Sequence, residues 1–224
     1  MGRRDRKRQK TREHIAETAR RLFAERGFTG VTVAEIAEAS DVSEQTVYNH
    51  FPTKEDLVFW RRGTFEAQLL TAIGDRPVGE SALAAFKRFV IQPRGTPSGD
   101  EPASQHESDE LRRSVMNRPE LSAHERTVLD SPALQDRERT IIAGYTASLA
   151  ALLSEDTGTP PDDVEPWVVA SAMLGVTQAL ISYARRRAIA GAKPPQLARE
   201  VRLQAERAVK LLEDGLGGYA IKKG

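Results

Sequence analysis

The segment SEQTVYNHF, residues 43–51, combines an apolar pair with an unusual density of hydrogen-bonding side chains. Val47 and Phe51 are four residues apart, so on a helix of about 3.6 residues per turn they share one face. The opposite face carries Gln45, Tyr48 and Asn49. The pattern predicts a short helix with one face for its own core and a second face for a polar partner, and groups of this kind suit the base edges and phosphates of a DNA duplex.

Signals on both sides of this segment predict a helix-turn-helix. Thr32 and Glu35 fit a capping box that opens one short helix, and Ser43 is a good N-cap for the next. Asp41 lies between them, where a tight turn requires a residue that tolerates the left-handed conformation. Two short helices joined by such a turn, packed on a third helix over residues 11–26, make this motif.

The rest of the chain also has helical periodicity, which predicts an all-α fold. Alternating patterns typical of strands are missing. Stretches rich in Pro, Gly and acidic residues at 92–110 and 157–166 predict loops. The expected helices beyond the motif span 53–73, 81–91, 111–117, 121–129, 134–153, 167–189 and 195–214.

Composition excludes several classes of protein. The chain has 224 residues, of which 39% are hydrophobic and 29% charged, values typical of a soluble globular protein. It has no cysteine, which excludes disulfides, thiolate metal sites and cysteine nucleophiles. We expect no run apolar enough to cross a bilayer and no signal peptide, and therefore a cytoplasmic protein without a membrane partner.

Charge is distributed unevenly along the chain. Residues 1–27 hold ten Lys and Arg against four acids, a local charge of +6, although the whole chain carries only +1. A basic end on an otherwise acidic protein is typical of proteins that bind a polyanion, and a solvated tail would show the same asymmetry.

Three stretches in this order and spacing, LFAERGFTGVTVAEIA (22–37), VSEQTVYNHF (42–51) and KEDL (54–57), resemble the TetR family of bacterial transcriptional regulators. The resemblance covers about a quarter of the chain strongly, and the remainder matches in helical character and length. It implies that the helix over 43–50 is the recognition helix and that the helix over 33–39 braces it. One departure is Asp41, where the family often has glycine.

The resemblance also implies which residues contact DNA. Those at positions that usually hold phosphates are Thr32, Tyr48, His50 and Lys54. The candidates for base contacts are Ser43, Glu44, Gln45, Thr46 and Asn49. Arg3, Arg4 and their neighbours are similar to the basic arms that sometimes reach the minor groove. Lys54 also stands at the first turn of a helix, where a cation opposes the helix dipole, which favours a nearby phosphate.

Members of this family are homodimers, mostly repressors that a small ligand releases from a palindromic operator. The resemblance therefore implies a DNA-binding domain over 1–53 and an effector-binding and dimerisation domain over 54–224. The helix over 167–189 is apolar nearly all round, so it must be covered on two sides. The expected dimer residues are Val168, Ala172, Gly175, Val176, Ala179, Leu197, Val201, Ala205, Ala208 and Leu212.

A small apolar or aromatic effector would need a lining of apolar and polar side chains in the second domain. The candidates are Trp60, Phe65, Phe89, Arg113, Met116, Tyr145, Thr177 and Gln178. Thr177 and Gln178 interrupt the most apolar helix, where a buried amide needs a partner. That partner is a ligand, the other residue of the pair, or the second subunit. The helix over 53–73 would transmit binding to the DNA motif.

Two alternatives belong to other classes. One is an architectural DNA-binding protein without an effector, and the other is a helical enzyme or carrier whose N-terminal motif is coincidental. No catalytic residues, metal or cofactor are predicted, because the four histidines lack metal-ligand spacing and no nucleophile has a recognisable base. The sequence leaves open the operator, the effector and the sign of regulation.

Overall fold

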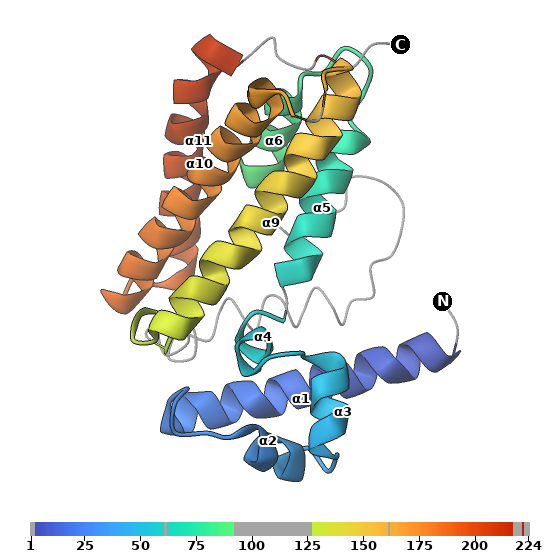
Figure 1. Ribbon diagram of the computed structural model, residues 1–224. Helices are drawn as coiled ribbons and strands as arrows, with labels where there is room; N and C mark the ends of the chain where they lie inside the picture. Colours follow the sequence, from blue (N-terminus) through green and yellow to red (C-terminus); the bar gives the residue numbers. More distant parts are fainter. Residues whose placement is uncertain (1–2, 61, 92–126, 161, 217–220, 222–224) are drawn as a thin grey trace. The chain divides into compact units, whose positions relative to one another are not determined.

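A computed structural model describes residues 3–60, 62–91, 127–160, 162–216 and 221. Every named regular element within these ranges is an α-helix, which confirms the all-α prediction (Figure 1). The helices are α1 (Arg3–Arg26), α2 (Val33–Ala39), α3 (Glu44–His50), α4 (Lys54–Val58), α5 (Arg62–Gly74), α6 (Ala82–Ile91), α9 (Pro132–Thr157), α10 (Val164–Ile189) and α11 (Pro194–Leu216). The helices expected over 111–117 and most of 121–129 lie outside the described residues.

The chain divides into two compact units. The first comprises Met1–Gly63 with Ser122–Arg139, and the second comprises Thr64–Leu121 with Thr140–Gly224. The helix α4 packs on α1 within the first unit. The boundary proposed from the sequence, between 53 and 54, therefore falls just ahead of α4.

Local signals account for the helix ends of the first unit. The Thr32 hydroxyl accepts the backbone N–H of Glu35 and the Glu35 carboxylate accepts the backbone N–H of Thr32, so the predicted capping box is present. Thr53 and Asp56 form a second capping box at the start of α4. The buried residues Ile15, Ala19 and Phe23 line one face of α1, as their spacing predicts.

The turn between α2 and α3 depends on Asp41, which has a φ of 53° and is the one non-glycine residue with positive φ in the described chain. This confirms the expected left-handed conformation. Replacing Asp41 with glycine is expected to raise the free energy of unfolding by up to about 1 kcal/mol, because glycine adopts this conformation without strain. Replacing Asp41 with valine should lower the free energy of unfolding by about 1–2 kcal/mol. Thermal unfolding of both variants would check this, and equal midpoints would contradict it.

The prediction of one continuous helix over 53–73 is wrong. The helix α4 ends at Val58, and α5 begins at Arg62 after an interruption at Phe59 and Trp60. The Phe59 side chain is buried, so the interruption turns an apolar group into the core of the first unit. Conversely, α1 is longer than predicted and begins at Arg3 rather than near residue 11.

The second unit contains the helices α5, α6, α10 and α11 and the C-terminal part of α9, packed around one core. The helix α10 packs against α11 and α6, and α11 also packs against α6. Leu69, Phe86, Leu149, Met173 and Val209 each bring a fully buried side chain to one shared core. Each of the five helices contributes one of them.

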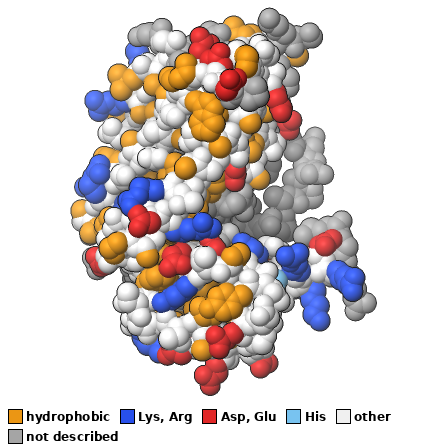
Figure 2. Space-filling model, viewed as in Figure 1, with side chains coloured by type: hydrophobic (Ala, Val, Ile, Leu, Met, Phe, Trp, Pro, Cys, Tyr) orange, Lys and Arg blue, Asp and Glu red, His pale blue; other side chains and the backbone are white. Residues whose placement is uncertain are grey.

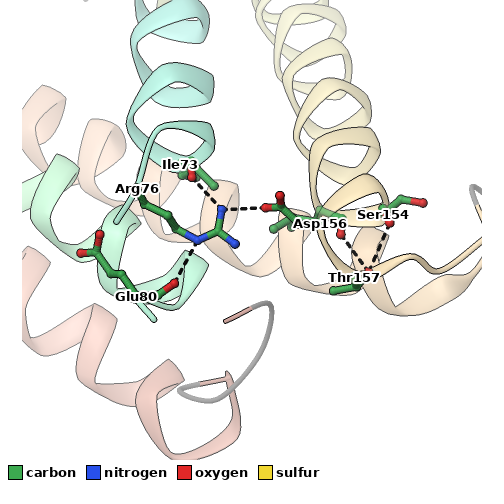
Figure 3. A network of polar contacts seen from close by, with 7 residues as sticks. Ile73, Arg76, Glu80, Ser154, Asp156 and Thr157 are labelled. Atoms are coloured by element: carbon green, nitrogen blue, oxygen red, sulfur yellow. Dashed lines mark hydrogen bonds and ion pairs between the residues drawn. The ribbon is translucent and has the colours of Figure 1, made fainter. Parts of the chain in front are cut away.

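The charged side chain of Arg76 lies fully inside this second unit (Figure 3). Arg76 is 1% exposed, and its guanidinium donates to the Ile73 and Glu80 carbonyls at 2.7 and 3.1 Å. It also forms an ion pair with Asp156 at 2.6 Å. Arg76 therefore joins the end of α5, the segment leading into α6 and the end of α9.

By length and composition α10 could cross a membrane, contrary to the expectation that no segment is apolar enough. The core helix of a soluble protein meets the same criterion, and α10 places Val169, Ala170 and Leu174 in the core of the second unit. Packing within the subunit therefore explains part of its apolar character, since 28% of its apolar stretch is buried.

Candidate nucleic-acid interface

The helix α3 has the two faces that its sequence predicts. Val47 and Phe51 are each 1% exposed, whereas Tyr48 is 44% exposed and Gln45 and Asn49 are also exposed. Ser43 caps the helix, and its backbone carbonyl accepts the N–H of Val47. The polar face is consequently available to a partner over the whole length of the helix.

Arg12 anchors the end of α3, a role that the sequence analysis missed. Its guanidinium donates to the His50 carbonyl at 2.8 Å and lies 4.6 Å from the centre of the Phe51 ring. A cation at a helix C-terminus is favourable because the last carbonyls carry partial negative charge. The available signal was helical spacing, since Arg12 precedes the buried Ile15 and Ala16 on the same stripe of α1.

Two of the expected base-contacting residues bond to each other. The Ser43 hydroxyl accepts the backbone N–H of Thr46 at 3.1 Å, and the two hydroxyls share a hydrogen bond of 2.8 Å. These groups stabilise the start of α3. Glu44, the next residue, is exposed in the first turn, where its charge is favourable with the helix dipole.

Gln45 and Asn49 form the second pair on this face. The Gln45 amide nitrogen Nε2 donates to Asn49 Oδ1 at 3.1 Å, and both residues are exposed. Because they stand four residues apart on a helix, this bond holds both amides on one side of α3.

Thr32 is committed to the cap of α2. Its hydroxyl donates to Glu35 Oε2 at 2.9 Å and accepts the Glu35 N–H at 3.2 Å. The backbone N–H of Thr32, then its hydroxyl, then Arg26 hold the pKa of Glu35 at about 2. This pKa lies below the ordinary value of 4.5, so the ionised Glu35 carboxylate stabilises the folded state at pH values above 4.5. The contribution is lost as the pH falls from 4.5 toward 2.

Lys54 has partners within the first unit. Its ammonium group donates to the Phe28 carbonyl at 2.5 Å and lies 4.2 Å from the centre of the Phe28 ring. Burial lowers the pKa of Lys54, while Glu55 and Glu35 oppose that shift. A phosphate is thus not needed to explain a lysine in the first turn of α4, where the helix dipole disfavours it. An ammonium has three donors, however, and the Phe28 carbonyl uses one of them.

His50 is half-buried at the end of α3. Burial is the main cause that lowers its pKa, and the charges of Arg8 and Arg12 add to it. The imidazole is therefore mostly neutral at pH 7 and acts toward an anion as a hydrogen-bond donor. In the described part of the chain, its Nδ1 atom is buried without a hydrogen-bond partner.

The start of α1 is a basic helix. The side chains of residues 4–10 are exposed and include Arg4, Arg6 and Lys7. Figure 2 shows Lys and Arg side chains along this projecting part of α1. Arg3 is the first residue of the helix. The basic arm expected from the sequence is thus helical from residue 3 of the chain onward.

Six of the eight residues expected to bind an effector fall into three groups. Phe65, Phe89 and Tyr145 meet in the second unit, where the Phe65 ring centre lies 5.6 Å from that of Phe89 and 5.8 Å from that of Tyr145. Trp60 belongs to the first unit. Arg113 and Met116 lie outside the described residues.

The expectation of a buried amide in α10 is wrong. Gln178 is exposed, so it needs no buried partner. Thr177 is buried, and its hydroxyl donates to the Met173 carbonyl one turn earlier at 3.3 Å. Neither residue therefore requires a ligand to satisfy it.

The residues expected at the dimer interface differ in exposure. Val168, Gly175 and Ala179 are exposed on α10, and Ala172 and Val176 are half-buried. On α11, Val201, Ala208 and Leu212 are half-buried, but Leu197 and Ala205 are buried against their own subunit. Among the described residues, the large apolar side chains that α11 exposes are instead Leu203 and Leu211.

Two family models match separate parts of the chain. Residues 15–59 match the family described as "Bacterial regulatory proteins, tetR family". Residues 112–203 match the family described as "MftR C-terminal domain".

Individual relatives agree with both matches. MftR of Mycobacterium tuberculosis is 29% identical over 190 residues, 80% of each chain. TcmR of Streptomyces glaucescens is 36% identical over 85 residues, which cover 38% of each chain. Among solved structures, Salmonella enterica GusR has a TM-score of 0.50 at 23% identity, with 92% of this chain and 95% of that chain covered. This likeness supports the fold.

Proposed function

Because the chain belongs to the TetR family of bacterial transcriptional regulators, we propose that it is a homodimeric repressor of the bacterial cytoplasm, released from a palindromic operator by a small molecule. This family consists of transcriptional regulators rather than enzymes. The observation that carries the proposal is the polar face of α3, which is exposed while the apolar face is fixed in the core.

DNA binding by this face follows from its dimensions and chemistry. An α-helix fits the major groove, which is about 12 Å wide, and its first residues reach the base edges. Gln45 and Asn49 are suited to bases, whereas Tyr48 and the neutral His50 are suited to phosphates. Lys54 offers phosphate the donors that Phe28 leaves unused, and we assign it to the same backbone contacts.

Selection of bound sequences from a random DNA pool would test this function. A dimer should select two inverted half-sites whose centres are about 34–36 Å apart, one turn of the duplex. A pool without enrichment after repeated rounds would overturn the proposal, and enrichment of bent or A·T-rich DNA without a motif would favour an architectural protein.

We propose that the dimer forms through the exposed faces of α10 and α11. Val164, Trp167 and Val168 expose 67%, 42% and 55% of their surface at the start of α10, and Leu211 on α11 exposes 83%. Large apolar side chains clustered on two packed helices are typical of protein interfaces. Gly175 lies on the same face of α10, where it lets a partner helix approach closely.

Replacing Gly175 with glutamine is expected to convert the dimer to a monomer. Among the described residues of its own subunit, a Cβ atom at Gly175 would meet nothing within 4 Å, so the substitution starts into open space there and we expect its main clash with a partner. Gly144 on α9 is a matched control, since it is also helical, exposed and free of neighbours within 4 Å. Sedimentation at micromolar concentration should show a monomer for Gly175→Gln and a dimer for Gly144→Gln. A dimer for both variants would contradict the proposed interface.

We assign effector binding to the neighbourhood of Phe65, Phe89 and Tyr145. Aromatic edges and faces recognise flat or apolar molecules, and these three rings are already in contact. An effector changes operator affinity only if it binds two conformations unequally, and a hundredfold difference corresponds to about 2.7 kcal/mol.

A compound that raises the thermal midpoint of the free protein is therefore expected to weaken operator binding. The screen would use apolar and aromatic compounds, followed by operator titration with each one that stabilises. Phe89→Leu should weaken ligand binding and leave operator affinity unchanged in the absence of ligand. Stabilising compounds that never alter operator affinity would favour the effector-free architectural alternative.

A further inference from the structure

The hydrogen bond between Gln45 and Asn49 limits what the Gln45 amide can offer to DNA. A glutamine amide has two N–H donors and one acceptor oxygen. Gln45 uses one N–H to bond Asn49 Oδ1 at 3.1 Å. It keeps its Oε1 acceptor and one N–H donor, which lie in one plane at the exposed end of the side chain.

An acceptor beside a donor matches one base in the major groove. Adenine presents the N6 amino donor next to the N7 acceptor, whereas guanine presents two acceptors, O6 and N7. Facing guanine, Gln45 Oε1 would oppose O6, and two acceptors repel. Facing cytosine, the remaining N–H would lack an acceptor. The free groups of Gln45 therefore suit adenine.

The position of Gln45 in α3 agrees with a contact to a base edge. It is the second residue of α3, and residues near the start of a recognition helix reach the base edges. The hydroxyls of Ser43 and Thr46, its neighbours on the same turn, are engaged with each other at 2.8 Å. Gln45 is thus the amide in the first turn of α3 whose remaining groups face outward.

Asn49 fixes the orientation of Gln45 before DNA arrives. A free glutamine side chain rotates about three bonds, and ordering it on binding costs affinity. A partner one turn along the helix orders it in advance. Asn49 does this through its acceptor atom Oδ1.

We propose, on the basis of the DNA-binding function set out above, that Gln45 reads an adenine in each half-site and that Asn49 is its positioning residue. Asn49 acts through Gln45 and sets its specificity. Both residues belong to one subunit, so each half-site of a palindrome should contain this A·T pair once.

Sequence selection with the full-length protein and four variants would test the proposal. The wild type should prefer adenine at one position of each half-site by about 5- to 150-fold over other bases. Gln45→Ala should lose the preference at that position alone. Gln45→Glu should change it to cytosine, whose amino group donates to a carboxylate.

The two substitutions at Asn49 distinguish positioning from mere helix stability. Asn49→Ala removes the acceptor and should weaken the adenine preference several-fold. Asn49→Asp retains an acceptor for the Gln45 N–H, so the adenine preference should persist while its added charge lowers affinity for all sequences. Gln9→Ala is the matched control, because Gln9 donates to Glu13 four residues later at 2.7 Å but lies on α1. It should leave the motif unchanged.

Several outcomes would overturn the adenine assignment alone. They are a wild-type motif that Gln45→Ala leaves intact, loss of a G·C position instead of an A·T position, and identical motifs for Asn49→Asp and Asn49→Ala. A wild type that selects no motif would instead overturn the DNA-binding function on which the assignment rests. Circular dichroism of each variant would establish that α3 remains folded.

Discussion

Replacing Arg76 with alanine is expected to lower the free energy of unfolding by about 3–5 kcal/mol. Arg76 is among the largest fully buried side chains of the described chain. Its removal leaves the Asp156 carboxylate without its ion-pair partner, and the Ile73 and Glu80 carbonyls without a donor. It also opens a cavity, so desolvated polar groups and lost packing act in the same direction.

Urea unfolding at fixed protein concentration would measure this loss. Arg139→Ala is the control, because Arg139 pairs with Asp136 on the surface of α9, where both side chains are about two-thirds exposed. An exposed pair contributes about 0–1 kcal/mol. Equal losses for the two variants would contradict a structural role for the buried guanidinium.

Comparing Arg76→Met with a double variant separates the effect of an unpaired charge on stability from the effect of lost side-chain volume. Arg76→Met fills most of the space but leaves Asp156 unpaired, and adding Asp156→Ala removes the unpaired charge. Burying apolar groups in place of an ion pair is often neutral or stabilising, so the double variant should be more stable than Arg76→Met alone. A more severe loss in the double variant would show that Asp156 stabilises the fold through contacts other than Arg76.

Local features of this fold could be predicted because their causes are close in sequence. Both capping boxes join residues three apart, Thr32 with Glu35 and Thr53 with Asp56. Val47 and Phe51 share a face because of helical periodicity alone. The same reasoning predicted the short helix α3 with one buried and one polar face, because this pattern is visible in nine residues.

Long-range contacts could not be predicted in this way. Arg12 and the His50 carbonyl are 38 residues apart, and Arg76 and Asp156 are 80 apart. From the sequence, each arginine could equally have been a solvated surface residue, because the residues next to it in the chain do not indicate a distant partner. The interruption after α4 was missed for a related reason, since neither proline nor glycine marks residues 58–62 and the cause is the burial of Phe59.

The wrong expectation for Gln178 in α10 and the uneven exposure of the residues expected to form the dimer on α11 have a different origin. A helix that is apolar nearly all round gives no direction to its faces, so the exposure of Gln178 was not predictable from periodicity. The helix α11 has one clear apolar stripe, and we assigned it to a partner subunit. The subunit itself buries Leu197 and Ala205 of that stripe and leaves its other expected members half-buried, while Leu203 and Leu211 are exposed.

The basic start of α1 leads to the second prediction with a large expected effect. From Arg3 to Arg12 the helix carries seven cations and one acid, a charge of +6. An α-helix with its side chains is about 10–12 Å across, whereas the minor groove is about 6 Å wide. As a helix, this segment cannot enter the minor groove in the manner first expected, and we infer that it contacts phosphates.

Replacing Arg4, Arg6 and Lys7 together with glutamine is therefore expected to weaken binding to every sequence alike. Glutamine preserves the helix, so the change is one of charge. Each lost phosphate contact should reduce the slope of log affinity against log salt by about 0.9, and three contacts would reduce it by about 2.7. Between 50 and 200 mM salt, the wild type should then lose about fortyfold more affinity than the variant.

Titration of one operator at several salt concentrations would measure both slopes, and sequence selection would compare both motifs. The control replaces Lys87, Arg88 and Lys193 in the second unit, which removes the same charge from exposed positions. That variant should keep the wild-type slope, because only cations that neutralise phosphates contribute to it. Equal slopes for the two triple variants would refute phosphate contacts by α1. A motif that loses preference only in flanking A·T pairs would mean that the segment unwinds and reads the minor groove.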